Sequence, residues 1–111
     1  MHSNFIELHN PDVMLSLEKA PAGGTAALYR FYNKAGELLY VGVTGNVLKR
    51  CSQHRLQSAW WFETWYMTLG WYRNRMEAFR AEADAIRTEL PWHNDQFNPR
   101  EDRTLYQQNK Q

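Results

Sequence analysis

The sequence contains one cysteine and no long hydrophobic run, and both absences narrow what the protein can be. Cys51 alone excludes an internal disulfide and a zinc site built from several cysteines. No apolar stretch approaches the roughly 18 residues that a membrane-spanning helix needs. The first ten residues, MHSNFIELHN, lack the basic start and hydrophobic core of a signal peptide. We therefore expect a protein of a reducing, cytoplasmic compartment without a membrane partner.

Aromatic residues are abundant, with five Trp, six Tyr and five Phe in 111 residues, which argues against disorder over most of the chain. The net charge of +1 is unevenly distributed. Residues 28–87 carry nine bases against five acids, whereas residues 1–27 and 88–111 are net negative. A basic central segment is typical of a protein that binds a phosphate-bearing partner, although charge alone favours a solvated surface of mixed charge.

The hydrophobic pattern predicts an α+β fold. Alternating apolar and aromatic residues indicate three strands, the first two joined as a β-hairpin. These strands cover residues 26–33, 37–43 and 65–72. Helical spacing indicates helices over 11–19, 47–57 and 75–90. The order β-β-α-β-α after the helical start predicts a small three-stranded antiparallel sheet flanked by helices.

We expect the chain to have three parts. An N-terminal helical lead covers residues 1–25, the folded domain covers 26–95, and a polar, flexible tail covers 96–111. The tail is assigned because it lacks hydrophobic periodicity.

In the last predicted helix, five apolar residues recur at steps of three and four. They are Met76, Phe79, Ala83, Ile86 and Leu90. Glu82 lies at the border of this stripe, where its carboxylate can reach a concave site and bind a hard divalent ion. A surface glutamate paired with Arg75 or Arg80 is the alternative, and the helix alone favours that alternative.

Two tyrosines stand on the predicted hairpin. Tyr29 and Tyr40 would lie near each other once the strands pair, and Gly42 would leave space for something to approach the backbone. The alternative is that both tyrosines are ordinary core residues whose hydroxyl groups reach solvent at the edge of the core.

Arg50 and His54 are four residues apart, so they project from one face of the predicted helix. An arginine makes two hydrogen bonds to a phosphate at once, and a histidine transfers protons near neutral pH. The alternative is a solvated helix face, because Lys49 and Arg55 are adjacent.

The sequence resembles the GIY-YIG nuclease superfamily over about residues 26–95. The two signatures of that family correspond to Ala27-Leu28-Tyr29 and Tyr40-Val41-Gly42, with the tyrosines eleven positions apart. Ala27 replaces the usual glycine, and Leu28 and Val41 replace isoleucines, which removes no reactive group. Further residues match at the family's spacing: Arg50, His54, Glu82, Ile86, Pro91 and Asn94.

The resemblance implies a mechanism for cutting a phosphodiester bond. Glu82 would bind a single Mg²⁺ or Mn²⁺ ion, and Arg50 would hold the nonbridging phosphate oxygens. Tyr29 or His54 would deprotonate the attacking water, while Tyr40 would orient the water or the phosphate.

Residues around this set have expected roles as well. Asn94 would tie the chain after the last helix to the wall of the site. Trp60-Trp61 either stacks on unpaired bases or, as we prefer, covers the end of the core. We take His2, His9 and His93 as surface residues, because none has a recognised ligand spacing. Four basic residues are candidates for nucleic-acid contacts: Lys49, Arg55, Arg73 and Arg75.

The sequence thus predicts a small, free-standing, metal-dependent DNA endonuclease. The alternatives are a noncatalytic nucleic-acid-binding module and a nuclease subunit that is active only within a complex. Sequence specificity is either modest or supplied by a partner protein or a homodimer. A role in a phage or other mobile element and a role in DNA repair both fit.

Overall fold

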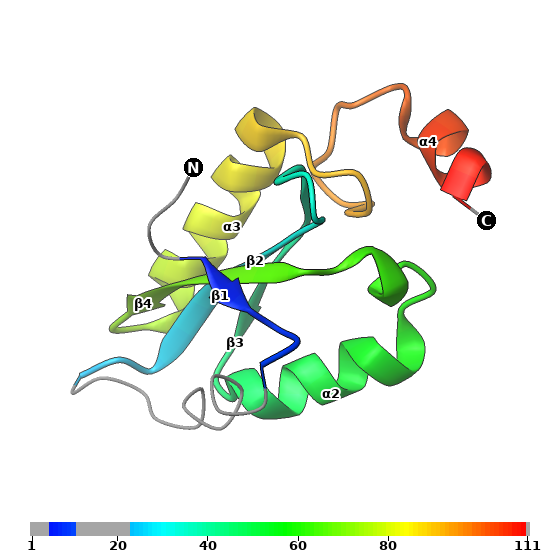
Figure 1. Ribbon diagram of the computed structural model, residues 1–111. Coiled ribbons are helices and arrows are strands. Elements are labelled where there is room, and N and C mark those ends of the chain that lie inside the picture. The colour runs from blue at the N-terminus through cyan, green and yellow to red at the C-terminus, as the bar shows by residue number, and fades with distance from the viewer. Residues whose placement is uncertain (1–4, 11–22, 111) are drawn as a thin grey trace.

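The computed structural model describes residues 5–10 and 23–110, and these form a sheet with helices on both faces (Figure 1). The helix predicted over 11–19 and the predicted surface position of His2 lie outside the described residues. Four antiparallel strands are arranged in the order β1-β4-β2-β3. Their bounds are Ile6–Glu7 (β1), Ala26–Tyr32 (β2), Leu38–Thr44 (β3) and Tyr66–Tyr72 (β4). The predicted α+β class is confirmed.

The centre of the sheet is β2, which pairs antiparallel with both β3 and β4. Its sequence, AALYRFY, is almost wholly buried because each face of the strand is covered by a helix. The hairpin to β3 closes through a hydrogen bond from the Asn33 amide to the Glu37 carbonyl, 3.0 Å long. Gly36 allows this turn because its φ is 87°.

The sheet contains one strand that the sequence pattern did not predict. In β1, Ile6 pairs with Met67 and Glu7 pairs with Tyr66, which adds a short strand beside β4. Two residues are too few to produce a recognisable alternation, so the predicted count of three strands was wrong by one.

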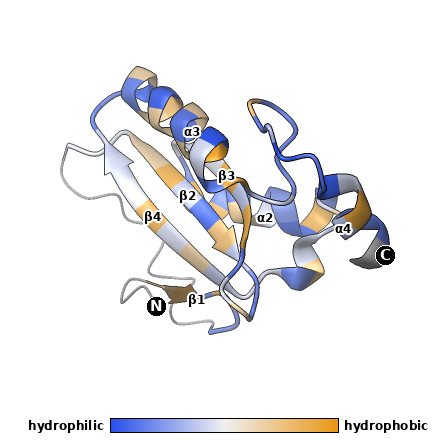
Figure 2. Cartoon of the chain, turned by 90° about the horizontal axis from the view of Figure 1, so that it is seen from above, coloured by the Kyte–Doolittle hydropathy of each residue, from blue (hydrophilic) through white to orange (hydrophobic). Residues whose placement is uncertain are grey.

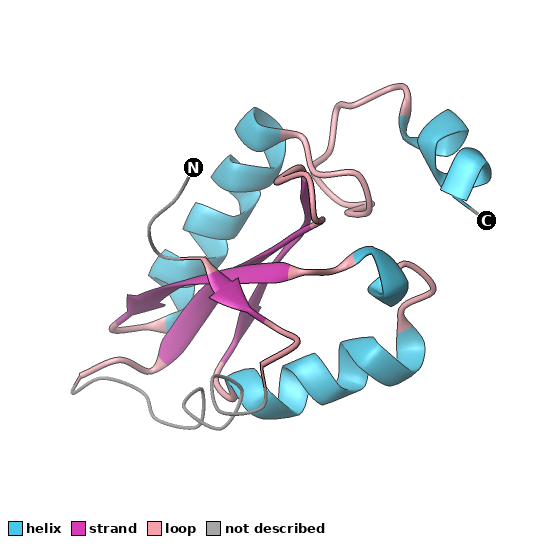
Figure 3. Ribbon diagram, viewed as in Figure 1, coloured by secondary structure: helices cyan, strands magenta, loops and turns pink. Residues whose placement is uncertain are grey.

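Two helices cover the two faces of the sheet: α2 (Val47–Gln57) and α3 (Arg75–Glu89) (Figure 3). Each begins at a predicted asparagine cap. The Asn46 side chain accepts a hydrogen bond from the Lys49 amide at 3.1 Å, and the Asn74 side chain accepts one from the Glu77 amide at 2.9 Å. Because α2 follows β3 and α3 follows β4, and these strands run parallel to each other, both helices start at the same end of the sheet.

The core therefore has two parts, one on each face. Under α2, large side chains gather on one face of β2 and its neighbours, whereas α3 packs against a smaller cluster. Figure 2 shows hydrophobic residues along β2 and β4 and mixed hydropathy along α3. The α2 cluster contains Ala27, Tyr29, Phe31, Leu39, Val47, Cys51 and Met67, and the α3 cluster contains Leu28, Val41, Ala85 and Ile86.

The predicted apolar stripe of α3 was wrong over its first half. Met76 and Phe79 are 61% and 47% exposed, whereas Ala78 and Ala85 are buried. Alanine lets the helix backbone approach the sheet closely, so small residues occupy the contact and larger ones are left outside. On the helix wheel Glu82 lies between the buried residues Ala78 and Ile86, nearer the middle of the sheet-facing side than we predicted.

The segment predicted to be a tail contains a helix that the sequence pattern did not indicate. Residues 103–110 form a helix, α4 (Arg103–Lys110), and its Tyr106 ring stacks on Trp92 with 4.1 Å between ring centroids. A short 3₁₀ helix, η1 (Trp61–Glu63), meets it, since the Tyr106 hydroxyl donates to Glu63. The C-terminal segment is thus packed against the domain through a few aromatic and polar contacts that leave no hydrophobic periodicity in the sequence.

Candidate active site

The two hairpin tyrosines lie on the α2 face of the sheet. Tyr29 pairs in register with Gly42, and Tyr40 pairs with Phe31, so the tyrosines are diagonal neighbours. Their ring centroids are 6.2 Å apart. A β-carbon added to Gly42 would collide with the phenol of Tyr29. The space that glycine leaves in β3 is therefore filled by the Tyr29 ring.

Arg50 and His54 extend from α2 to the Tyr29 hydroxyl. Arg50 Nε donates to that oxygen at 3.0 Å, and His54 Nε2 lies 2.8 Å from it. Since Arg50 can only donate, the phenol proton is left for His54 Nε2. His54 Nδ1 then carries its own proton and donates to Ser58 Oγ at 2.8 Å. Each member of this chain has a partner, so burial does not leave its polar atoms unsatisfied.

Burial sets the protonation states of this chain. The pKa of His54 is lowered to about 4, first by burial and then by the charge of Arg50, so its imidazole is neutral at pH 7. Burial raises the pKa of Tyr29 above its ordinary value, and the hydrogen bond from Arg50 opposes this only in part. Burial likewise raises the pKa of Tyr40. At rest the site holds neutral phenols and a neutral imidazole that can accept a proton.

Glu82 faces the same site from α3. Although α3 covers the other face of the sheet, β3 is an edge strand, and the Glu82 side chain shares a pocket with Tyr40 at that edge. The pocket has a volume of about 220 Å³. The charge of Glu82 contributes to the raised pKa of both tyrosines, which places the carboxylate in their electrostatic range. The residues lining the pocket are Tyr40, Glu82, Ile86, His93, Asn94, Asp95, Gln96 and Phe97.

Asn94 fixes the loop that follows α3 to the edge of the sheet. Its side-chain oxygen accepts from the Val41 amide at 2.8 Å, and its side-chain nitrogen donates to the Val41 carbonyl at 2.9 Å. Two bonds to one residue imitate the pairing of a further strand. Because Asn94 is buried, these bonds are shielded from water, and they hold the loop in the position expected from the sequence.

Comparison with known proteins identifies the family of the domain. The family model for the GIY-YIG catalytic domain matches residues 25–96, well over half of the chain. The chain belongs to the GIY-YIG family. No curated protein and no solved structure matches it.

Membership in the GIY-YIG family indicates a nuclease-type function. Proteins with this domain are generally endonucleases that act on DNA and typically use divalent metals. Within residues 5–10 and 23–110, no helix is both long enough and apolar enough to cross a membrane.

The oxygen donors of the GIY-YIG site fit a divalent cation. Burial raises the pKa of Glu82, with the charge of Arg50 opposing, and Glu82 has no hydrogen bond or ion pair with any other described residue. No three His, Cys, Asp or Glu side chains gather into a metal cage in the described part of the chain. The Glu82 carboxylate and Tyr40 line the same pocket, and such a donor set, with water completing the shell, suits Mg²⁺, which retains several of its waters.

The position of one residue near the candidate site was not predicted from the sequence. His93 was taken as a surface residue, but it is buried, and its Nε2 lies 3.0 Å from Glu63 Oε2. Trp60 stacks on both His93 and Tyr40, at centroid distances of 5.2 and 5.1 Å. The tryptophan pair therefore packs on the core, as we preferred. A histidine and a glutamate thirty residues apart leave no spacing signal that could have paired them.

The four candidate DNA-binding cations do not line the pocket that contains Tyr40 and Glu82. Lys49 and Arg55 are exposed on α2, and Arg73 and Arg75 are exposed where β4 leads into α3. None of the four has an ion-pair partner within residues 5–10 and 23–110. The structure therefore leaves them available to a polyanion, on elements that border the GIY-YIG site.

Proposed function

We propose that the protein is a metal-dependent DNA endonuclease that hydrolyses phosphodiester bonds with a single divalent ion. The observation that carries this proposal is that Tyr40 and Glu82 line one pocket and that the hydrogen-bonded chain Arg50–Tyr29–His54 lies next to Tyr40. Few purely structural arrangements would bring a guanidinium, two phenols and a carboxylate that has no hydrogen bond or ion pair with another described residue into electrostatic range of one another.

Glu82 and water would hold the ion, Mg²⁺ or Mn²⁺, which when bound neutralises phosphate charge and stabilises the leaving oxygen. Arg50 binds the nonbridging oxygens. It has five N–H donors, and only some of them are used by Tyr29 and Gln53. Because both neighbours fix the guanidinium, it needs little reorganisation when the phosphate arrives.

The proton of the attacking water passes along the same chain. Tyr29 takes this proton as it gives its own to His54 Nε2, which lies 2.8 Å away. A bound phosphate offsets the charge of Arg50, which is the second cause of the low pKa of His54, and so makes the imidazole a better acceptor. Tyr40 orients the water or the phosphate through its hydroxyl.

The exposed cations would guide the DNA backbone to the pocket. Lys49, Arg55, Arg73 and Arg75 are the residues we assign to this role, and each phosphate contact they make would weaken with added salt. A homodimer or a partner protein would supply sequence specificity.

A plasmid-nicking assay tests the proposed activity. Supercoiled DNA is incubated with the wild type, Glu82→Gln or Arg50→Ala in Mg²⁺ or Mn²⁺. Glu77→Gln is the matched control, because Glu77 is an exposed glutamate on the same helix. We expect cutting by the wild type and the control only. A wild type that binds DNA without cutting it would favour a noncatalytic module or a subunit of a complex, and undiminished cutting by Glu82→Gln would refute the metal assignment.

A further inference from the structure

Phe97 is an aromatic side chain in the wall of the candidate active site, one residue beyond the family match. It lines the same pocket as Tyr40 and Glu82, yet it is 51% exposed. The surrounding loop residues, Asp95, Gln96 and Asn98, are polar. No catalytic step requires an apolar ring at this position, so the proposed mechanism does not explain it.

The backbone at Phe97 is in the left-handed region, with a φ of 61°. In the described residues, Leu90 is the one other non-glycine residue with positive φ, and it lies at the C-terminus of α3, where that conformation is usual. Phe97 ends no helix. A bulky residue in this conformation is strained, and such strain gathers at sites that hold a ligand.

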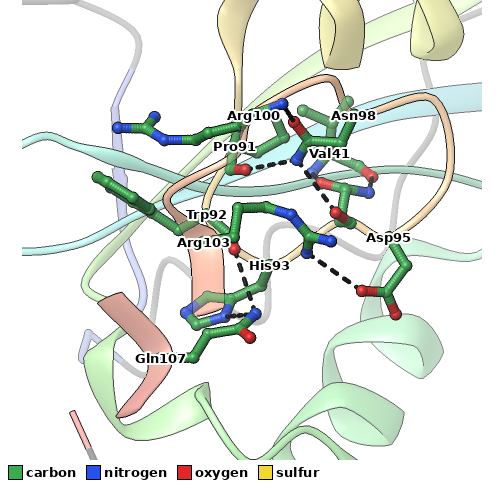
Figure 4. A network of polar contacts seen from close by, with 10 residues as sticks. Val41, Pro91, Trp92, His93, Asp95, Asn98, Arg100, Arg103 and Gln107 are labelled. Atoms are coloured by element: carbon green, nitrogen blue, oxygen red, sulfur yellow. Dashed lines mark hydrogen bonds and ion pairs between the residues drawn. The ribbon is translucent and has the colours of Figure 1, made fainter. Parts of the chain in front are cut away.

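Hydrogen bonds on both sides of the loop maintain this conformation (Figure 4). Asn98 Nδ2 donates to the Pro91 carbonyl at 2.7 Å and to the Asn94 carbonyl at 3.0 Å. The Arg100 amide donates to Asn98 Oδ1 at 3.1 Å, and Arg100 Nη1 donates to the Leu90 carbonyl at 2.7 Å. Because Asn94 is itself bonded to Val41, the loop that carries Phe97 is fixed to the edge of the sheet beside the pocket.

The Phe97 ring is also braced from one side. The Arg87 guanidinium lies over it, 5.3 Å from the centroid. With about half of the residue exposed, the ring offers aromatic surface to a ligand next to the pocket. Trp60, the other aromatic candidate for base contacts near this site, already stacks on Tyr40 and His93.

We propose that Phe97 stacks on an unpaired nucleobase adjacent to the phosphate that is cut, so that the preferred substrate is DNA with a single-stranded or displaced base at that position. This inference rests on the proposed nuclease function and refines its substrate class. An aromatic ring stacks on any base because every base has a π face. In an intact duplex both faces of each base are covered by its neighbours, whereas an unpaired base can be turned onto the ring.

Fluorescence of a forked DNA tests the proposal without cleavage. A duplex with a single-stranded arm carries 2-aminopurine at the first unpaired position, and binding is measured in EDTA with the full chain. Stacking on Phe97 should quench the fluorescence. In Phe97→Asn we expect loss of this quenching and a Kd for the fork about tenfold higher, with an unchanged Kd for a blunt duplex.

The choice of variants separates stacking from folding. Asparagine tolerates positive φ, so Phe97→Asn should keep or raise the melting temperature while it removes the ring. Phe97→Tyr and Phe97→Trp should retain both quenching and affinity. Phe62→Asn is the matched control, because Phe62 is an exposed phenylalanine that does not line this pocket.

Two results overturn the proposal in distinguishable ways. If the wild type nicks DNA but Phe97→Asn keeps full quenching and fork affinity, the base contact is wrong while the nuclease function stands. If the wild type neither binds nor cuts any DNA, the proposed function fails and this inference fails with it. A fork preference that is lost in Phe97→Asn and kept in Phe97→Tyr supports it.

Discussion

The two helices that flank the sheet lie beside different kinds of groups in the candidate site. On the α2 side, Arg50, Tyr29 and His54 form a continuous hydrogen-bonded chain in which each member has a partner. On the α3 side, Glu82 has no hydrogen bond or ion pair with another described residue, and burial raises its pKa. The α2 wall, formed by Arg50, Tyr29 and His54, thus has its hydrogen bonds in place without a ligand. The α3 wall carries Glu82, an acid whose charge no described residue pairs with.

This difference indicates that the two walls have different roles in the site. The α2 wall is organised before any ligand arrives, which suits groups that orient a phosphate and move a proton. The α3 wall becomes electrostatically balanced only when a cation binds, so cation binding should be coupled to the stability of the fold. Stability lost at an incomplete site is a common cost of activity.

Glu82→Gln should show the largest effect. We expect cleavage to fall by roughly a thousandfold, because metal-assisted charge stabilisation contributes several kcal/mol. The same variant should unfold at a higher temperature than the wild type in EDTA. A raised pKa means that folding disfavours the charged form, so Glu82 lowers stability as the pH rises through its folded-state pKa.

Nicking assays and thermal unfolding at pH 5 and 8 measure both effects. The stabilisation by Glu82→Gln should be greater at pH 8, and addition of Mg²⁺ should stabilise the wild type more than the variant. Glu77→Gln, on the exposed side of the same helix, should change none of these values. A variant less stable than the wild type in EDTA would contradict the idea that Glu82 is uncompensated.

The pH dependence of stability tests whether the α2 wall holds His54 in its neutral form. Its pKa of about 4 lies below the ordinary 6.5, so between these values the unfolded chain binds a proton that the folded protein does not. Stability should therefore fall as the pH is lowered from 6.5 to 4, by on the order of 3 kcal/mol. Urea unfolding of the wild type and His54→Gln across this range isolates the effect, because His93 is present in both proteins. Parallel pH profiles for the two would show that His54 is not held neutral by the fold.

Gly42→Ala breaks the packing of the α2 wall. A β-carbon there collides with the Tyr29 ring, which must move away from Arg50 and His54. We expect a loss of about 2 kcal/mol in the free energy of unfolding and a matching fall in cleavage. Gly70→Ala is the control, because a β-carbon at Gly70 in β4 has no heavy atom within 4 Å. Equal effects of the two substitutions would mean that general strand propensity, rather than the Tyr29 contact, is responsible.

The α2 wall was also the part of the molecule that the sequence revealed best. Asn46 caps the predicted helix α2, and Tyr29, Tyr40 and Gly42 stand on the predicted hairpin, because caps and alternation are local signals. With α2 anchored at its cap, a spacing of four residues was sufficient to place Arg50 and His54 on one face.

The α3 wall and the C-terminal segment were harder to predict because tertiary packing determines them. A helix wheel shows that Met76 and Phe79 are apolar, but it does not show that alanines allow the closer approach to the sheet. The buried position of His93 depends on Glu63 and Tyr106, which come from η1 and α4. Contacts between such distant residues leave no local pattern.

Tyr106→Phe should give the smallest effect and tests whether the C-terminal segment supports the α2 wall. The Tyr106 hydroxyl donates to Glu63, which holds His93, and His93 stacks on Trp60 beside Tyr40. Loss of this hydrogen bond should lower the free energy of unfolding by about 1 kcal/mol. Since the phenyl ring of the variant would keep the stacking on Trp92, cleavage should fall by no more than a few fold. KM should be unchanged if only the position of Tyr40 is affected.

The control is Tyr72→Phe, which removes the hydroxyl group of a half-buried tyrosine in β4. If both variants behave alike in urea unfolding and in cleavage rate, α4 stabilises itself without acting on the catalytic wall.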